Sequence, residues 1–347
     1  VQATRVLRNA AVMSFRVSFI SISCLVLRSV HAERTNPSDD ESGFLQVMSG
    51  VESASTSSIL SARGFGGLGA WFLGSSGPEL LQHGSAPEPS RTELLCYVKQ
   101  RMQGVTLLDT KSRLAPPVES LRRGLQGKCA VVSNSGAMLQ HKFGSAINQA
   151  SSVLRFNDAP VASQLQEHVG SRETVRLVND FFVGQALAGR TPIRRGGVYV
   201  LTPHGENTEH IDILRRRWTK ATFHLMSAEF ENATRELLTS LYDTRSWKKG
   251  TSMQPTTGAM GMLMAMSLCD SMDAYEMSPS DAAAKASYNY YSQGDSALRN
   301  SWHKSFEAEH DFWLRLSETP REKGKANGLL GFRGLGSSAC SGKKKKP

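Results

Sequence analysis

The sequence predicts an α/β fold with a mostly parallel central sheet flanked by helices. From Lys128 onwards, short runs rich in β-branched and apolar residues alternate with helix-like runs. This alternation is typical of parallel strands joined by crossover helices. The 347 residues, of which 39% are hydrophobic, are enough to bury one sizeable core or two smaller ones.

The predicted elements follow one another in a regular order. Residues 92–102 are expected to form a first helix, and the run 118–128 leads into the first strand. The strand-like runs are CAVV (129–132), SVLRFN (152–157), TVRLVN (174–179), GVYVLTP (197–203) and TFHLM (222–226). The later helix-like runs are HIDILRRRW (210–218), ENATRELLTSLYD (231–243) and TGAMGMLMAMSLCD (257–270).

The ends of the chain differ in composition from this unit. Residues 1–32 carry Arg16 before the apolar run 17–27 and small residues around Ala32, a pattern that favours a signal peptide or signal anchor. Residues 33–91 are rich in Ser, Gly and Pro and predict a flexible stem. We therefore expect a folded domain over residues 92–320 and a basic disordered tail over residues 321–347.

The net charge of +10 does not indicate nucleic-acid binding. Lys and Arg balance Asp and Glu within residues 124–318, so the excess lies in the ends, including Lys343 to Lys346. Such ends more often reflect membrane topology or a solvated tail than a surface for DNA or RNA. No nucleic-acid partner is expected.

The first strand runs directly into Ser133-Asn134-Ser135-Gly136, four small residues suited to a tight turn. In α/β proteins, a strand that ends in such a turn is a common phosphate or nucleotide site, because exposed N–H groups attract negative charge. An ordinary strand-to-turn junction is the alternative interpretation of this run.

A second anion-ready segment begins at Gln254. Pro255 and Thr256 form a strong helix start, and Gly258 keeps that start sterically open. The helix that follows is apolar on every side and rich in methionine, so it must be buried. A helix N-terminus that carries two hydroxyls and a glycine is suited to holding an anion.

The chain resembles the eukaryotic sialyltransferases in four segments. Cys129 to Arg172 resembles their large sialyl motif, and Pro255 to Tyr275 their small one. Tyr288 to Tyr291 is similar to the short third motif, and Trp302 to Trp313 to the very small motif. The resemblance covers roughly residues 124–316, and it implies a Rossmann-like glycosyltransferase fold of a GT-A-like variety.

The resemblance implies a CMP-sugar donor, held by the two anion-ready segments. It also implies a disulfide between Cys129 and Cys269, which needs an oxidising lumen; two buried free thiols are the alternative. Cys96 and Cys340 are either unpaired or paired with each other. The residues that the resemblance assigns to the donor are Asn134, Ser135, Gly136, Asn157, Thr256, Thr257 and Gly258.

The resemblance also assigns catalytic roles. His303 matches the family's general base, which takes the proton of the acceptor hydroxyl. Without the resemblance, His303 would be interpreted as a surface histidine. Asn289, Tyr290 and Glu309 fall in the two short motifs. The chain has no Asp-x-Asp pair, so we expect no metal site and no cofactor besides the donor substrate.

Several positions depart from the family pattern. Ser133 and Glu276 stand where glycine is common, and Asn289 stands where many members carry a histidine that helps the phosphate leave. Three residues lie between His303 and Glu307 and five between His303 and Glu309, whereas the family has four. The local alignment favours Glu309 as the match.

Three functions remain open. The first is a metal-independent, inverting sialyltransferase that acts on a glycoprotein or glycolipid in the Golgi or ER lumen. It would be held there by a single N-terminal membrane anchor or be soluble in the secretory pathway. The second is a transferase that uses CMP-Kdo or a related 2-keto sugar. The third is an inactive homologue that binds a CMP-sugar or a glycan.

Overall fold

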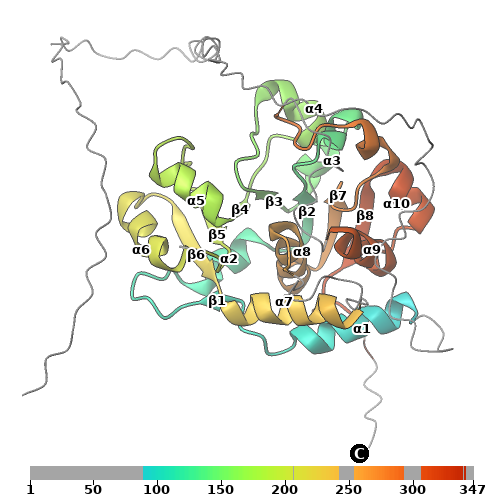
Figure 1. The fold of residues 1–347 in the computed structure, drawn as a ribbon, viewed down its shortest axis with the longest axis horizontal. Coiled ribbons are helices and arrows are strands. Elements are labelled where there is room, and N and C mark those ends of the chain that lie inside the picture. Colours follow the sequence, from blue (N-terminus) through green and yellow to red (C-terminus); the bar gives the residue numbers. More distant parts are fainter. Residues whose placement is uncertain (1–88, 206, 242–253, 293–305, 339, 341–347) are drawn as a thin grey trace, which may run out of the picture. The chain divides into compact units, whose positions relative to one another are not determined.

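All the strands of the described residues lie in one sheet. The computed structural model describes residues 89–205, 207–241, 254–292, 306–338 and 340. The sheet order is β1-β6-β5-β4-β3-β2-β7-β8 (Figure 1). The strands are β1 (Leu108–Asp109), β2 (Lys128–Val132), β3 (Ser152–Phe156), β4 (Val175–Val178), β5 (Val198–Leu201), β6 (Thr222–Met226), β7 (Ser271–Tyr275) and β8 (Leu329–Arg333).

The strand directions confirm the predicted fold class. Every neighbouring pair from β6 across to β7 is parallel, and only the two edge strands, β1 and β8, pair in the antiparallel sense. The strands β2 to β6 coincide with the five strand-like runs of the sequence. Because they are parallel, their carboxyl ends all lie at one edge of the sheet.

Helices cover both faces of this sheet, as in a doubly wound α/β protein. The α-helices of the described residues are α1 (Arg91–Met102), α2 (Val118–Gly124), α3 (Gly144–Gln149), α4 (Gln166–Val169), α5 (Asp180–Leu187), α6 (Asn207–Arg217), α7 (Ala228–Leu241), α8 (Thr257–Leu268), α9 (Phe306–Leu316) and α10 (Arg321–Asn327). Short 3₁₀ helices lie at η1 (Gly136–Gln140), η2 (Ser163–Leu165) and η3 (Asp281–Lys285).

Burial on both faces explains why the central strands are mostly apolar, and the polar side chains among them, Arg155, Arg176 and His224, are themselves buried. On β2, Cys129 and Val131 join the core under α8, whereas Ala130 and Val132 join a second core with residues of η1 and α3. A third core packs α5 and α6 against β4, β5 and β6. Successive side chains of a strand point to opposite faces, so a strand covered on both sides buries both sets. A polar side chain there needs a partner, as Arg155 has in the Val169 carbonyl.

Helix α8 is buried on all sides, as its sequence predicts. Its methionines at 260, 262, 264 and 266 are fully inaccessible to solvent. The helix lies on β2, β3, β4 and β7 on one side and contacts α7 on the other (Figure 1). The methionines are therefore core residues.

Strand β7 was not predicted from the sequence. Its run, SMDAY, is five residues long and contains Asp273, so it lacks the apolar pattern of the other central strands. It becomes a strand because β2 and β8 flank it on both sides. Lys128 forms an ion pair with Asp273, 2.7 Å between Nζ and Oδ2, which offsets the charge within the sheet.

The predicted disordered tail over residues 321–347 is wrong in its first part. Residues 321–327 form α10, Gly328 ends that helix in a left-handed conformation, and β8 follows as the edge strand of the sheet. Leu330 and Phe332 alternate into the core and are buried. The short apolar run LLGFR is stable as a strand only because it pairs with β7. Charged residues precede it in the sequence, so the run was not recognised as a strand.

The predicted signal segment (1–32) and nearly all of the predicted stem (33–91) lie outside the described residues. No helix among the described residues is both long enough and apolar enough to cross a membrane.

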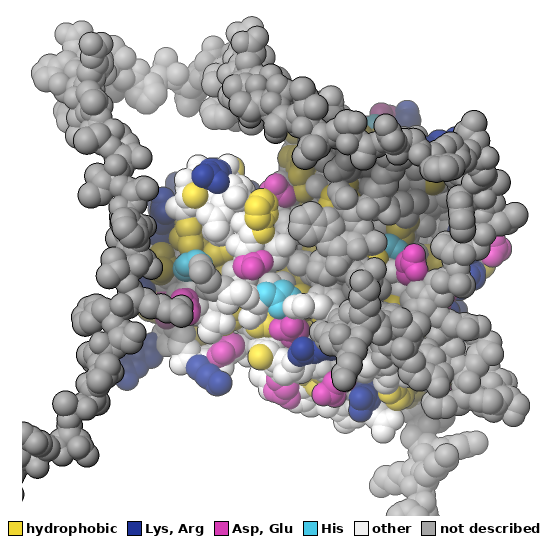
Figure 2. Space-filling view, viewed as in Figure 1, with side chains coloured by type: hydrophobic (Ala, Val, Ile, Leu, Met, Phe, Trp, Pro, Cys, Tyr) yellow, Lys and Arg dark blue, Asp and Glu magenta, His cyan; other side chains and the backbone are white. Residues whose placement is uncertain are grey.

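Charged side chains of both signs are spread over the described surface. On the face in Figure 2, Lys and Arg side chains lie along the left margin, and Asp and Glu side chains lie among them nearer the centre. This agrees with the near balance of charge over residues 124–318.

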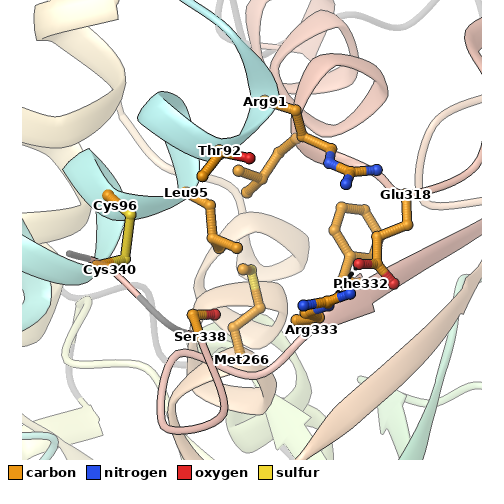
Figure 3. Close-up of a pocket in the computed structure, with 11 residues that line it drawn as sticks. Arg91, Thr92, Leu95, Cys96, Met266, Glu318, Phe332, Arg333, Ser338 and Cys340 are labelled. Atoms are coloured by element: carbon orange, nitrogen blue, oxygen red, sulfur yellow. Dashed lines mark ion pairs between the residues drawn. A yellow bond between two sulfur atoms is a disulfide. The ribbon is translucent and has the colours of Figure 1, made fainter.

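Two disulfides join distant parts of the chain. Cys129 on β2 pairs with Cys269 at the end of α8, which confirms the pairing implied by the sialyltransferase resemblance. Cys96 on α1 pairs with Cys340 (Figure 3), a bond that the sequence left open. Disulfides of this kind persist in oxidising compartments. A cavity of about 70 Å³ lies beside the second bond, between Leu95, Met266 and Phe332.

We predict that loss of the Cys96–Cys340 bond lowers stability without changing the site. The bond closes a loop of 244 residues, so the Cys96→Ala/Cys340→Ala variant is expected to lose about 2–5 kcal/mol of unfolding free energy. Urea denaturation under non-oxidising and oxidising conditions measures the loss. A variant as stable as the wild type in oxidising buffer would contradict the bond.

Candidate active site

The turn after β2 is closed by its own serines and by the third sequence motif. The Ser133 hydroxyl accepts a hydrogen bond from the Ser135 N–H (2.8 Å), and the Ser135 hydroxyl caps η1. The Gly136 N–H donates to the Ser287 carbonyl (3.1 Å). Ser135 also forms a β-bridge with Asn289. Two segments more than 150 residues apart therefore form one edge of the site.

Asn134 lies at the centre of this edge. Its side-chain amide donates to the Tyr291 hydroxyl (3.1 Å), and that hydroxyl donates to Asp158 (2.8 Å). The Asn134 carbonyl accepts a hydrogen bond from the Tyr290 N–H. Its side-chain oxygen is buried and has no hydrogen-bond partner among the described residues. A buried acceptor without a partner costs free energy, and a ligand N–H or O–H would satisfy it.

Asn157 lies at the end of β3, beside this turn. It adopts a left-handed backbone conformation with φ of 47°, which asparagine tolerates better than most residues. Its side-chain oxygen accepts a hydrogen bond from the Asn179 N–H (3.0 Å), and Asn179 caps α5. Asn157 thus links the carboxyl ends of β3 and β4. The contact with a nucleotide that the resemblance assigns to it stays a prediction.

The N-terminus of α8 forms the second part of the site. The Thr256 hydroxyl caps the helix by accepting from the Ala259 N–H (2.9 Å). The N–H groups of Thr257 and Gly258, in the partly exposed first turn, have no hydrogen-bond partner among the described residues. Free N–H groups at the positive end of a 12-residue helix attract an anion.

Glu309 holds this helix start in place. Its carboxylate accepts two hydrogen bonds from Thr256, one from the backbone N–H (2.9 Å) and one from the hydroxyl (2.6 Å). Both residues are buried. Glu309 comes from α9, so the small and very small motifs meet here. The geometry gives Glu309 a positioning role, because its oxygens are engaged by Thr256.

The two parts of the site meet at the carboxyl edge of the sheet. Helix α8 crosses β2, β3 and β4, and it approaches so closely that a Cβ atom at Gly261 would lie 2.4 Å from Phe156 at the end of β3. Phe156 also accepts a hydrogen bond from Asn134 through its carbonyl. This edge is where open parallel sheets bind ligands.

The catalytic residues predicted from the short motifs are only partly visible. His303 lies outside the described residues. Asn289 is half-buried and joins the turn through its backbone. The Tyr290 hydroxyl donates to the Pro160 carbonyl (2.8 Å), and burial raises its pKa to about 12. Tyr290 therefore stays protonated at neutral pH, and its catalytic role stays a prediction.

The other histidine of the very small motif is a weak base. Burial lowers the pKa of His310 to about 4, because it disfavours the charged imidazolium. An efficient general base has a pKa near the working pH. His310 does not meet this condition.

Sequence comparison identifies the family. The profile of glycosyltransferase family 29 (sialyltransferase) matches residues 97–320, more than half of the chain. The chain belongs to this family. Two of its relatives are the human and mouse beta-galactoside alpha-2,6-sialyltransferases 1. The human protein is 28% identical over an alignment 243 residues long, and the alignment covers 62% of this chain and 57% of the relative. The mouse protein is 27% identical over an alignment 241 residues long, which covers 62% of this chain and 58% of the relative.

The chain spans little more than half the length of these two curated relatives. Among solved structures, the crystal structure of a mammalian sialyltransferase is 18% identical, with a TM-score of 0.40 over 67% of this chain and 76% of that one. A second structure, in complex with Gal-beta-1-3GalNAc-ortho-nitrophenol, is 16% identical, with a TM-score of 0.35 over 69% and 86%.

The structure accounts for one departure of this sialyltransferase-family domain from the family pattern. Glu276 adopts a left-handed conformation with φ of 52°, where glycine carries no steric cost. Its buried carboxylate lies 3.2 Å from the His141 ring and accepts from the Ser280 N–H (3.0 Å). Its own N–H donates to the Gly328 carbonyl. Glu276 therefore links β7 to η3 and to the end of α10.

Two residues of the site were missed in the sequence. The Asp158 carboxylate accepts a hydrogen bond from the Tyr291 hydroxyl, and the Asn179 N–H donates one to the Asn157 side chain. Both are polar residues just after a buried strand: Asn179 directly follows β4, and Asp158 lies two positions after the end of β3. This position is where α/β proteins place binding residues, and it could have identified them.

We predict that Gly136 tolerates no side chain. A Cβ atom there would lie 2.3 Å from the Ser287 carbonyl oxygen, so Gly136→Ala must separate the two segments and is expected to cost about 2 kcal/mol or more. Gly184→Ala is the matched control, because nothing lies within 4 Å of its Cβ position on α5. Thermal unfolding compares the two variants. Equal stability of both would contradict the close approach at Gly136.

We predict that Glu309→Gln loosens the start of α8. Glutamine keeps one acceptor oxygen and loses the charge, so the unfolding free energy is expected to fall by about 1–3 kcal/mol. Any stabilisation of the fold by added CMP should weaken as well. Glu307→Gln, two residues away and exposed, should change neither quantity. Indistinguishable effects of the two variants would count against the positioning role.

Proposed function

We propose that the protein transfers a sialic acid from CMP-sialic acid to a glycan hydroxyl, with inversion at the sugar carbon. The observation that carries the proposal is the meeting of the Asn134 turn and the α8 N-terminus at one sheet edge, in a chain of the sialyltransferase family. The unpaired Asn134 oxygen suits a donor hydrogen on the nucleotide. The free N–H groups of α8 suit its phosphate or the sugar carboxylate.

In the proposed reaction, His303 takes the proton of the acceptor hydroxyl as that oxygen attacks the anomeric carbon. The bond from the anomeric carbon to the phosphate breaks, and CMP leaves with the electron pair. The low basicity of His310 supports assigning the proton transfer to His303. The positive end of α8 stabilises the charge that develops on CMP. No metal ion is required in this scheme.

We propose a β-galactoside as the acceptor, because the two relatives compared above are beta-galactoside alpha-2,6-sialyltransferases. The proposed location is the Golgi or ER lumen, with a single N-terminal membrane anchor or a cleaved signal. The two disulfides support an oxidising lumen.

The test is CMP release by the full chain in the presence of EDTA, with CMP-sialic acid or CMP-Kdo as donor and a mixed pool of β-galactoside glycans. We expect release with CMP-sialic acid and a fall of about 100-fold or more in His303→Ala. His83→Ala, in the predicted stem, is the matched control and should keep full activity.

The other outcomes choose among the alternatives. If CMP is released from CMP-Kdo and not from CMP-sialic acid, the donor is CMP-Kdo. Loss of release in EDTA, restored by a divalent cation, would overturn metal independence. If neither donor releases CMP while CMP still raises the melting temperature, the protein binds the donor without turnover.

A further inference from the structure

A second cavity lies at the edge of the sheet opposite the candidate active site. It has a volume of about 230 Å³ and is formed by the turns that precede β5 and β6. These turns are joined by backbone hydrogen bonds from Gly196 to the Lys220 carbonyl (2.7 Å) and from Thr222 to the Gly197 carbonyl (2.9 Å). Because β2 to β6 are parallel, the amino ends of the strands lie far from the carboxyl ends that carry the Asn134 turn.

The cavity is strongly basic. Four of its eight lining residues are cationic, and no lining residue is acidic. The cations are Arg194, Arg195, Arg217 and Lys220, and all four are exposed. Arg195 and Lys220 form no ion pair with any residue in the described part of the chain. Their charges are available to a ligand. Figure 2 shows Lys and Arg side chains on the side of the surface where Figure 1 places α6.

Two of the cations are held in fixed positions. The Arg194 guanidinium donates to the Glu173 carbonyl (3.1 Å) and lies 3.5 Å from the Glu173 carboxylate, which also pairs with Arg176. The Arg217 guanidinium lies 4.6 Å from the centroid of the Trp218 ring and donates to the Leu187 carbonyl (2.8 Å). A cation fixed in advance loses less side-chain entropy when it binds an anion.

We propose that this cavity binds a sulfated oligosaccharide. Three of the four cations are arginines, whose planar groups form paired hydrogen bonds with oxyanions. Ile193 and Trp218 also line this open cavity, so an oligosaccharide would find apolar surface beside the cations, whereas a membrane surface needs only exposed cations. Sulfate esters are one class of oxyanion that glycans carry, and the matched ligand of the experiment below, which keeps the carboxylates and lacks the sulfates, tests this choice.

This site is separate from the transfer reaction, and it goes beyond the proposed function. A glycan held here would tether the protein to an anionic glycan chain while the opposite edge of the sheet remains free for donor and acceptor. The separation also makes the inference testable in an inactive protein, because binding at this cavity requires neither His303 nor the α8 N-terminus.

The experiment measures binding of a sulfated heparin tetrasaccharide to the full chain by calorimetry, with the desulfated, N-acetylated tetrasaccharide as the matched ligand. We expect binding of the sulfated form only. The Arg195→Ala/Lys220→Ala variant is expected to weaken binding about tenfold, with an unchanged melting temperature because both side chains are exposed. Lys111→Ala/Arg123→Ala removes the same charge from exposed positions elsewhere and should change binding less than twofold.

Four results would overturn the proposal. They are no binding to the wild type, equal weakening in the two double variants, displacement of the tetrasaccharide by CMP, and binding to phosphatidylserine vesicles without binding to the tetrasaccharide. Equal weakening would mean attraction by overall charge, and displacement by CMP would place the sulfated ligand in the donor site. A failure of transfer activity leaves this measurement unaffected.

Discussion

The contact between Glu309 and Thr256 fixes the part of the structure on which the candidate site depends. The middle of helix α8 is buried on every side, and Thr256 at its N-cap is buried too, so the cap needs partners from within the protein. The Thr256 hydroxyl caps the helix, and Glu309 in turn accepts from that hydroxyl. At the other end of α8, the Cys129–Cys269 bond ties the helix to β2. The helix is thus fixed at both ends against the central strands.

Because this helix is fixed, the polar groups at the carboxyl edge of the sheet are held in defined positions. The turn after β2 is held against the segment that follows η3, because the Gly136 N–H donates to the Ser287 carbonyl and leaves no room for a side chain. With both segments constrained, an unpaired acceptor on Asn134 and free N–H groups at α8 lie at the same edge. A buried polar group without a partner lowers the free energy of unfolding, and such groups occur at sites where a ligand supplies the missing hydrogen bond.

The two edges of the sheet carry different chemistry for a topological reason. Parallel strands place all turns of one kind on the same side, so the βα turns that include Asn134 and Asn157 form one surface. The αβ turns before β5 and β6 form another, where three arginines and a lysine line the cavity and Arg194 pairs with Glu173. The near balance of charge over residues 124–318 conceals this local separation, because a net charge sums over both edges.

The sequence by itself determined the fold class, the five central strands and the buried helix α8, and it predicted the two segments that we propose bind the donor. Strands buried on both faces are mostly apolar, and a helix buried on all sides is apolar all round, so CAVV and the methionine-rich run of α8 were visible without a structure. The resemblance to sialyltransferases supplied the Cys129–Cys269 pair, which no spacing rule gives.

Only the tertiary structure decided the elements that depend on partners distant in sequence. Strand β7 contains Asp273, and β8 follows a charged helix, so each is a strand only because a neighbour pairs with it. The same holds for the Cys96–Cys340 bond, for the positioning role of Glu309 and for the basic cavity. The local pattern of apolar residues predicts how deeply a residue is buried. These features depend instead on which residue, distant in the sequence, it contacts.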